Sequence, residues 1–264
     1  MGKYRVAYAT GSRADYGIVK KFLGLLDKDK DIEFSVLVTG SHLEDKFGHS
    51  VDIIRQDGFK IDLEIPLNIE NDSNANVMHC MASALDCFGN YFENNKFDLL
   101  IILGDRYEMM AVAIAAAMQR IPILHLHGGE VTYGNYDEFI RHSITKMSQY
   151  HFTSTEVYRK RVIQLGEDPK RVFYLGALGA ENCCKIDEEK VIEKVKELTA
   201  QKYWVVAFHP ETLTAVKMEE QVREILTALQ KNMDGMSVVF MGTNADTNSD
   251  IIRSSWLSYV NEHE

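Results

Sequence analysis

The residues with the clearest capacity for chemistry lie in one stretch, HLHGGEVTYGNYDEFIRH, at positions 125–142. Glu130 and Asp137 carry carboxyl groups that could transfer protons, and Arg141 could bind an anion or orient an acid. The paired glycines before Glu130 would let the backbone approach a ligand closely. A helix with a surface ion pair between Asp137 and Arg141 would explain the same residues without any function. The stretch therefore predicts either an ordinary connection or a site for acid–base chemistry.

Two histidines of this stretch, His125 and His127, would share one face of an extended strand. Their HxH spacing suits zinc, but no third ligand follows at a matching distance in the sequence. We therefore expect core or loop histidines here, and no metal.

The elements that must position these residues alternate between short apolar runs and longer segments of helical period. Several runs are apolar on both faces, as in a parallel sheet that helices cover on both sides, so we predict a doubly wound α/β fold. The expected strands are residues 4–9, 34–39, 60–65, 99–103, 122–126, 150–154, 171–175, 203–208 and 236–241. The expected helices lie near residues 16–27, 43–56, 74–95, 106–119, 136–148, 155–165, 187–199, 216–231 and 248–260.

A domain boundary is expected near residues 176–186, where GALGAENCC interrupts the alternation. The predicted domains are a Rossmann-like domain at 1–178 and a partial Rossmann-like, nucleotide-binding domain at 179–264. Because the second domain has only two clear strands, we expect it either to pack firmly on the first or to be incomplete.

Polar residues follow several of the expected strands, at the edge where open parallel sheets bind ligands. Asp105 follows residues 99–103 as a helix N-cap or as an acid beside Arg106. Arg13 could reach an anion, and Asp15 could cap a helix that begins near residue 16. The turn TGSRADYG is not GxGxxG and gives no indication of a nicotinamide cofactor.

Three further polar residues follow strands in the same way. His42 follows residues 34–39, where a local hydrogen bond is the simpler explanation. His209 and Asn244 follow the two strands of the second predicted domain, and would face the first domain if a cleft separates the two.

Composition limits the class of protein. The chain has 264 residues, 45% of them hydrophobic, and a formal net charge of -10, which argues against nucleic acid as the main partner. No apolar run is long enough to span a membrane, and the N-terminus lacks the pattern of a signal peptide. The 4 cysteines form no metal-type CxxC pair, so a reduced, cytoplasmic setting is expected.

Taken together, SRADYG, GSHLEDKFG, LGDRYEMMA, HGGEVTYGNYDEFIRHSITKMSQYHFTSTE, FHPET and TNADTNSD resemble the hydrolysing UDP-N-acetylglucosamine 2-epimerases. This family makes N-acetylmannosamine and related sugars for sialic-acid-type pathways. The resemblance implies two Rossmann-like domains around a cleft, the GT-B arrangement. It also implies elimination of UDP across C1 and C2 of the sugar, followed by hydration of a glycal, with no cofactor or metal.

The resemblance assigns roles to particular residues. The positions that match the family's acid–base set are Asp105, Glu130, Asp137 and His209. Those expected to bind substrate are Arg13, His42, Arg106, Arg141 and Asn244. Which acid or histidine removes the C2 proton stays open. Relatives also suggest a homodimer or homotetramer, for which residues 74–95 and 106–119 could supply an apolar face or could be core.

The sequence departs from the family at two points. Several relatives have glutamate at the position of His127, so that acid's role could pass to Glu130, or the substrate could differ. Relatives also continue past the equivalent of residue 264 with a Gly-Asn-Ser-Ser loop and a glutamate that grip UDP, which predicts an incomplete second domain. The alternatives are the same reaction on a UDP-diacetamido sugar, a non-hydrolysing epimerase, and a non-catalytic UDP-binding or assembly module.

Overall fold

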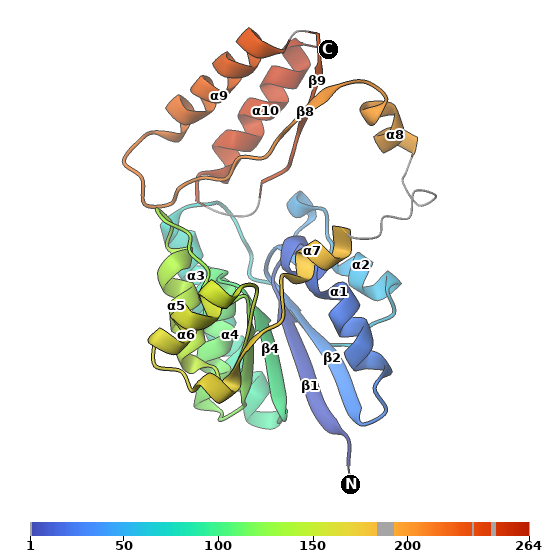
Figure 1. Cartoon of the computed structure of the whole chain (residues 1–264), viewed down its shortest axis with the longest axis vertical. Helices are drawn as coiled ribbons and strands as arrows, with labels where there is room; N and C mark the ends of the chain where they lie inside the picture. The colour runs from blue at the N-terminus through green and yellow to red at the C-terminus, as the bar shows by residue number, and fades with distance from the viewer. Residues whose placement is uncertain (1, 184–192, 234, 244–246, 264) are drawn as a thin grey trace. The chain divides into compact units, whose positions relative to one another are not determined.

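The computed structural model describes residues 2–183, 193–233, 235–243 and 247–263 (Figure 1). The chain divides into two compact units, one formed by residues 1–71 and 75–184 and the other by residues 72–74 and 185–264. The predicted boundary between residues 178 and 179 stays a prediction.

The first unit is built on a parallel sheet of 7 strands in the order β3-β2-β1-β4-β5-β6-β7. The strands are β1 (Tyr4–Thr10), β2 (Ile32–Thr39), β3 (Ile61–Ile65), β4 (Leu99–Leu103), β5 (Ile123–Leu126), β6 (Tyr150–Thr153) and β7 (Val172–Tyr174). Each predicted strand of this unit is confirmed. Because the order reverses between β1 and β4, the carboxyl ends of these two strands form the crevice in which such sheets bind ligands.

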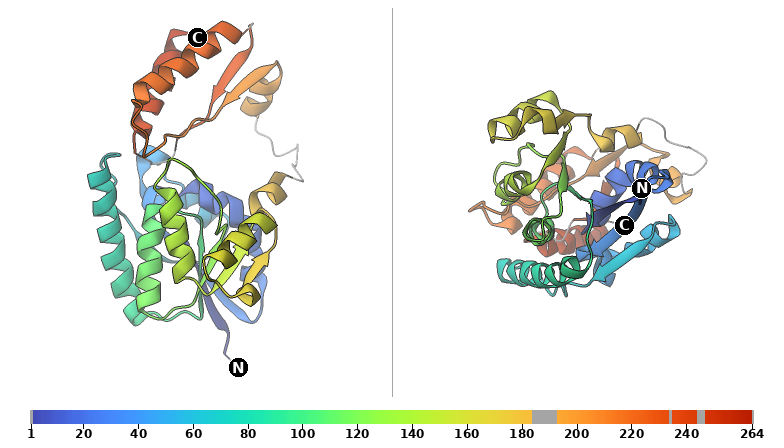
Figure 2. Two further views of the ribbon diagram at one scale, coloured as in Figure 1. Left: turned by 60° about the vertical axis from the view of Figure 1, so that its left-hand side comes forward. Right: turned by 90° about the horizontal axis from the view of Figure 1, so that it is seen from below.

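Helices lie on both sides of this sheet, as Figures 1 and 2 show. They are α1 (Arg13–Lys28), α2 (Val51–Gln56), α3 (Asn74–Asn94), α4 (Tyr107–Met118), α5 (Asp137–Met147), α6 (Glu156–Gln164) and α7 (Leu178–Cys183), with the 3-10 turns η1 (Gly40–Leu43), η2 (Asp45–Phe47) and η3 (Pro169–Arg171). Val19 and Leu23 of α1 pack with Val36 of the sheet in one fully buried cluster. On the other side, α4 is buried along most of its length, which explains its nearly continuous apolar sequence.

Two segments differ from the sequence prediction. The helix expected at 43–56 is divided into η1, η2 and α2, since Gly48 and His49 adopt positive φ values of 83° and 43°. The segment expected to be an interruption contains α7, whose Asn182 donates through Nδ2 to the backbone oxygens of Gly17 and Ile18 in α1. A short helix of this kind has too few periodic positions to predict from sequence.

The second unit contains the parallel pair β8 (Tyr203–Val206) and β9 (Ser237–Phe240), with α8 (Glu193–Thr199), α9 (Met218–Asn232) and α10 (Ser249–Glu262). Its core is small. Phe240 stacks on Trp256 with ring centroids 4.6 Å apart, and Met218, Val222 and Ile252 are buried around them. Across the described parts of both units, none of the helices combines the length and apolar character needed to cross a membrane.

Candidate functional site

The strands β4 and β5 place two predicted acids side by side. Asp105 follows β4 and Glu130 follows β5, and the two strands pair in parallel with Leu103 opposite Leu126. Gly104, with a φ of 74°, turns the chain out of β4 immediately before Asp105. The carboxyl edge of the sheet therefore brings together residues that are far apart in sequence.

Arg141 is the centre of this arrangement. Its buried guanidinium donates through Nη2 to Oδ2 of Asp105 and, at 2.7 Å, to Oγ1 of Thr132. Through Nη1 it donates to the backbone oxygen of Glu130 at 2.9 Å and to Oε2 of Glu138 at 3.2 Å. We call these five residues the Arg141 cluster. Arg141 therefore contacts one of the predicted acids directly, and its role in orienting that acid stays a prediction.

Burial lowers the pKa of Arg141 to about 10, which still leaves the guanidinium charged at neutral pH. It is therefore a permanent cation between the carboxylates of Asp105 and Glu138. Asp137 is the first residue of α5 and is half-buried. Arg141 forms ion pairs with Asp105 and with Glu138, and the pair expected between helix positions 137 and 141 stays a prediction.

Glu130 is held by a second set of contacts. Its Oε1 accepts hydrogen bonds from Oγ of Ser154 and lies 3.1 Å from Nδ1 of His127. Burial raises the pKa of the Glu130 carboxyl, but the hydrogen bonds from His127 and Ser154 outweigh it, and the net shift is downward. Glu130 is therefore an ionised carboxylate at neutral pH.

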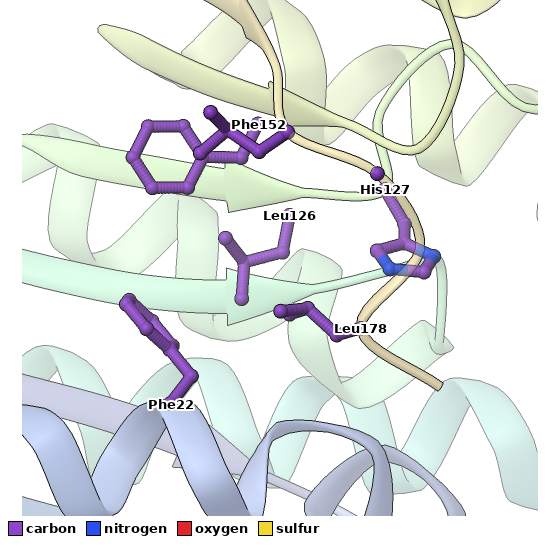
Figure 3. Close-up of a pocket in the computed structure, with 7 residues that line it drawn as sticks. Phe22, Leu126, His127, Phe152 and Leu178 are labelled. Carbon is purple, nitrogen blue, oxygen red and sulfur yellow. The ribbon is translucent and has the colours of Figure 1, made fainter. Parts of the chain in front are cut away.

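His127 has an unusual backbone. Its φ of 63° lies in the left-handed region, and it is the first residue after the end of β5. Its Nε2 is buried and has no hydrogen-bond partner among the described residues. Its ring helps to line a small pocket of about 70 Å³, together with Leu126, Phe152 and Leu178. Figure 3 shows the His127 ring at one end of these side chains.

The glycines of the GGE sequence are required by close packing. A Cβ at Gly129, where φ is 79°, would lie 2.6 Å from the backbone oxygen of Tyr158. A Cβ at Gly128 would lie 3.0 Å from Nδ1 of His125. These glycines therefore allow the loop that carries Glu130 to lie directly on α5 and α6.

His125 is a core residue, as one of the alternatives predicted. Its Nε2 donates to the backbone oxygen of Gly104 at 2.7 Å, and its Nδ1 lies 3.0 Å from Oγ1 of Thr145. Complete burial lowers the pKa of His125 to about 3, so the ring is neutral. It joins the end of β4 to α5, and so supports the elements that carry Asp105 and Arg141.

The turn after β1 is organised by a capping box. Ser12 is the N-cap of α1 and Asp15 is the third helical residue, so the expected cap at Asp15 is wrong by three positions. Asp15 also accepts hydrogen bonds from the backbone of Gly11 and from Oγ1 of Thr10. Arg13 begins the helix and is exposed at this edge of the sheet, where it could meet an anion.

His42 lies beneath this turn and is fully buried. Its Nε2 is 3.0 Å from Oγ1 of Thr10 and its Nδ1 is 2.8 Å from Oγ of Ser50. Burial lowers the pKa of His42, although the nearby Asp15 raises it. In this conformation His42 supports the Asp15 turn from within, and direct contact with substrate stays a prediction.

Arg106 is the N-cap residue of α4, so the expected cap at Asp105 is also wrong. The side chain of Arg106 donates through Nε to Oε1 of Glu108 at 2.6 Å. Sequence reasoning missed Glu108, Glu138 and Ser154. For Glu108, the available indication was an acid at the start of a helix that is otherwise almost entirely apolar.

Two predicted residues belong to the second unit. His209 follows β8 and is exposed. Asn244 lies outside the described residues.

The sequence is similar to known proteins along almost its whole length. Residues 25–263 match the protein family described as UDP-N-acetylglucosamine 2-epimerase. Polysialic acid biosynthesis protein P7 of Escherichia coli is 45% identical over 262 residues, which cover 98% of this chain and 67% of that protein. The GDP/UDP-N,N'-diacetylbacillosamine 2-epimerase (hydrolyzing) of Campylobacter jejuni is 35% identical, over 100% of this chain and 69% of that protein. The chain thus spans about two thirds of the length of these relatives.

Solved structures show the same fold. The UDP-GlcNAc 2-epimerase of Neisseria meningitidis bound to UDP-GlcNAc superposes with a TM-score of 0.78 at 18% identity, over 98% of this chain and 70% of that one. The Methanocaldococcus jannaschii UDP-GlcNAc 2-epimerase in complex with UDP-GlcNAc and UDP gives a TM-score of 0.78 at 14% identity, over 98% of this chain and 71% of that one. The predicted fold class is therefore confirmed.

Proposed function

Because this chain belongs to the UDP-N-acetylglucosamine 2-epimerase family, we propose that it is a hydrolysing epimerase, which converts UDP-N-acetylglucosamine to UDP and N-acetylmannosamine. The hydrolysing form of the reaction is favoured by relatives that are named as hydrolyzing 2-epimerases, at 35% and 32% identity.

The proposed reaction has two steps. A base removes the proton from C2 while the bond from C1 to the UDP oxygen breaks, and its electron pair leaves with UDP. The resulting glycal has a double bond between C1 and C2. Water then adds hydroxyl to C1, and an acid returns a proton to C2 on the opposite face, which inverts that centre. Both steps are redox-neutral and need only acids, bases and stabilised charge.

The Arg141 cluster is the observation that carries this proposal. It fixes Asp105 beside the loop of Glu130, so that two carboxylates with different surroundings share one edge of the sheet. Such pairs suit a reaction that needs both a base and an acid. In the proposal Glu130 is a base, because its carboxylate is ionised and its loop is held next to Asp105 by Arg141, while Asp105, Asp137 and His209 complete the acid–base set.

The remaining predicted residues bind substrate in this scheme. Arg13 is exposed at the start of α1, where a cation and backbone N–H groups suit a phosphate. We propose that the same substrate is also bound by Arg106, His42 and Asn244.

The sugar itself has a second candidate. Relatives at 35% and 32% identity are named for N,N'-diacetylbacillosamine, which favours a UDP-sugar with a second acetamido group. The more similar protein P7, at 45% identity, is named for polysialic acid biosynthesis, and for this reason N-acetylmannosamine is the product proposed first.

The test is to incubate the 264-residue chain with each UDP-sugar in D2O and to follow the products by NMR. We expect free UDP and N-acetylmannosamine that carries deuterium at C2. UDP-N-acetylmannosamine as the product would instead indicate the non-hydrolysing reaction. Binding of UDP without turnover of either sugar would indicate the non-catalytic module.

Asp105→Asn provides the control for this experiment. It keeps the size of the side chain and can still accept a hydrogen bond from Arg141, but it cannot take up or release the proton. We expect UDP release to fall by at least about a hundredfold, the usual range for loss of a general acid or base. The oligomer, expected to be a dimer or tetramer, would be measured by light scattering on the same sample.

A further inference from the structure

Glu108 is a fully buried carboxylate at the start of α4, two residues after Arg106. Its Oε1 accepts a hydrogen bond from Nε of Arg106 at 2.6 Å, and the Arg106 side chain is only 12% exposed. Its Oε2 is buried and has no hydrogen-bond partner among the described residues. A buried carboxylate needs a charged partner, and here that partner is Arg106.

Two glycines leave the space that the Glu108 carboxylate occupies. A Cβ at Gly11, after β1, would lie 2.2 Å from Oε1 of Glu108. A Cβ at Gly40, after β2, would lie 3.0 Å from the same oxygen and 2.7 Å from the backbone oxygen of Gly11. Ser41 donates through Oγ to that backbone oxygen at 3.0 Å and holds the two turns together. The carboxylate therefore lies directly beneath the ends of β1 and β2, beside the crevice at which the strand order reverses.

We propose that Glu108 is a positioning residue for the epimerase reaction, which fixes the guanidinium of Arg106 next to Asp105 at the ligand-binding edge of the sheet. This inference rests on the proposed function. A bond to Nε fixes the plane of a guanidinium, because Nε lies in that plane at the base of the fork. Glu108 acts through Arg106, and it is itself too deeply buried to meet a sugar.

Kinetics of a double-mutant cycle test this role. Arg106→Lys keeps the charge but removes the planar group and its Nε donor. We expect Glu108→Gln alone, which exchanges a charge-assisted hydrogen bond for a neutral one, to lower kcat/KM about tenfold. In the Arg106→Lys background the same change should cost less than about threefold, because the contact is already lost. The proposal would be overturned if Glu108→Gln lowered kcat/KM by the same factor in the wild type and in Arg106→Lys, since a merely structural Glu108 gives that result.

Gly11→Ala would displace the Glu108 carboxylate by a substitution in a different part of the fold, the turn after β1. We expect it to reduce kcat/KM as Glu108→Gln does, and to add little to that variant. The matched control is Gly24→Ala in α1, where nothing lies within 4 Å of the added Cβ. Full activity of Gly11→Ala in a folded protein would contradict the packing argument.

NMR of the arginine side chains tests the pairing without relying on turnover. The Nε–H of Arg106, assigned by its loss in Arg106→Lys, should resonate downfield and exchange slowly with water. Glu108→Gln should move it upfield and speed its exchange. If the wild-type chain shows this behaviour but turns over no UDP-sugar, the proposed function fails while the pairing stands. An Nε–H that Glu108→Gln leaves unchanged overturns the positioning role, whether or not the chain is active.

Discussion

Replacement of Arg141 by lysine is the most direct test of the candidate site. The guanidinium donates to four acceptors that come from the end of β4, the loop after β5 and the first turn of α5. Lysine keeps the charge, but its single nitrogen cannot span acceptors on both arms of the guanidinium. The side chain of Asp105 or that of Glu138 must therefore lose its cation.

The magnitude follows from the contacts that lysine cannot make. Each hydrogen bond to a charged group contributes about 1.5–3 kcal/mol, and neighbouring bonds are not additive. Asp105 and Glu138 are 26% and 30% exposed, so solvent recovers part of the loss. We expect Arg141→Lys to lower the free energy of unfolding by about 2 kcal/mol, and Arg141→Met, which removes the guanidinium that Asp105 and Glu138 share, by about 3 kcal/mol or more. UDP release should fall at least about tenfold for lysine, because Asp105 is no longer held in place.

Differential scanning calorimetry and UDP release would be measured on the same preparations, at a temperature where circular dichroism shows each variant to be folded. Because the chain forms two compact units, the transition of the first unit is the one to follow. Arg171→Lys is the matched control, since Arg171 is an exposed residue of the same unit. If Arg141→Lys and Arg141→Met matched this control in both stability and activity, the Arg141 cluster would have no part in the site.

Three other changes have defined outcomes. Because the pKa of His125 is lowered to about 3, its stabilising contribution is complete above the unfolded pKa and is lost as pH falls. With an unfolded pKa of about 6.5, the free energy of unfolding should fall by about 1.3 kcal/mol between pH 7 and pH 5.5 because of this group. Urea titrations at the two pH values should show this additional loss in the wild type and not in His125→Gln. Gly129→Ala, at positive φ and against the backbone oxygen of Tyr158, should cost about 2 kcal/mol or more in the same titration. Trp256→Ala should lower the stability of the second unit by about 3 kcal/mol, seen in calorimetry as a shift of its transition alone, because Trp256 stacks on Phe240 in a small core.

Hydrophobic pattern was sufficient for the strands, because each is a short apolar run, and those in the middle of the larger sheet are buried on both faces. Residues 34–39 and 99–103 are typical, and the structure buries nearly all of both. Pattern failed at residues 43–56, where helical spacing continues across a turn that Gly48 and His49 make with positive φ. Periodicity records which face of a segment is buried but not whether its backbone is continuous.

The region of the site was also predictable, because the ends of parallel strands meet at one edge whatever their sequence separation. The partners within it were not. Helical spacing favoured Asp137 as the partner of Arg141, whereas the structure pairs Arg141 with Asp105, 36 positions earlier in the chain. A contact of this kind depends on how far α5 extends past the end of β4, and a single sequence does not contain that distance.

Buried polar groups mark the limit of the sequence argument and also explain how the site keeps its shape. A local hydrogen bond was the simpler expectation for His42, and the structure places the ring fully inside the turn that presents Arg13, in a hydrogen-bonded network with Thr10 and Asp15. Glu108 similarly lies beneath that turn, where Gly11 leaves it room. Such groups are costly to bury away from their hydrogen-bonded or charged partners, so a loop built on them has few alternative conformations. The exposed residues of this edge are therefore held by polar residues that a sequence pattern would place in water.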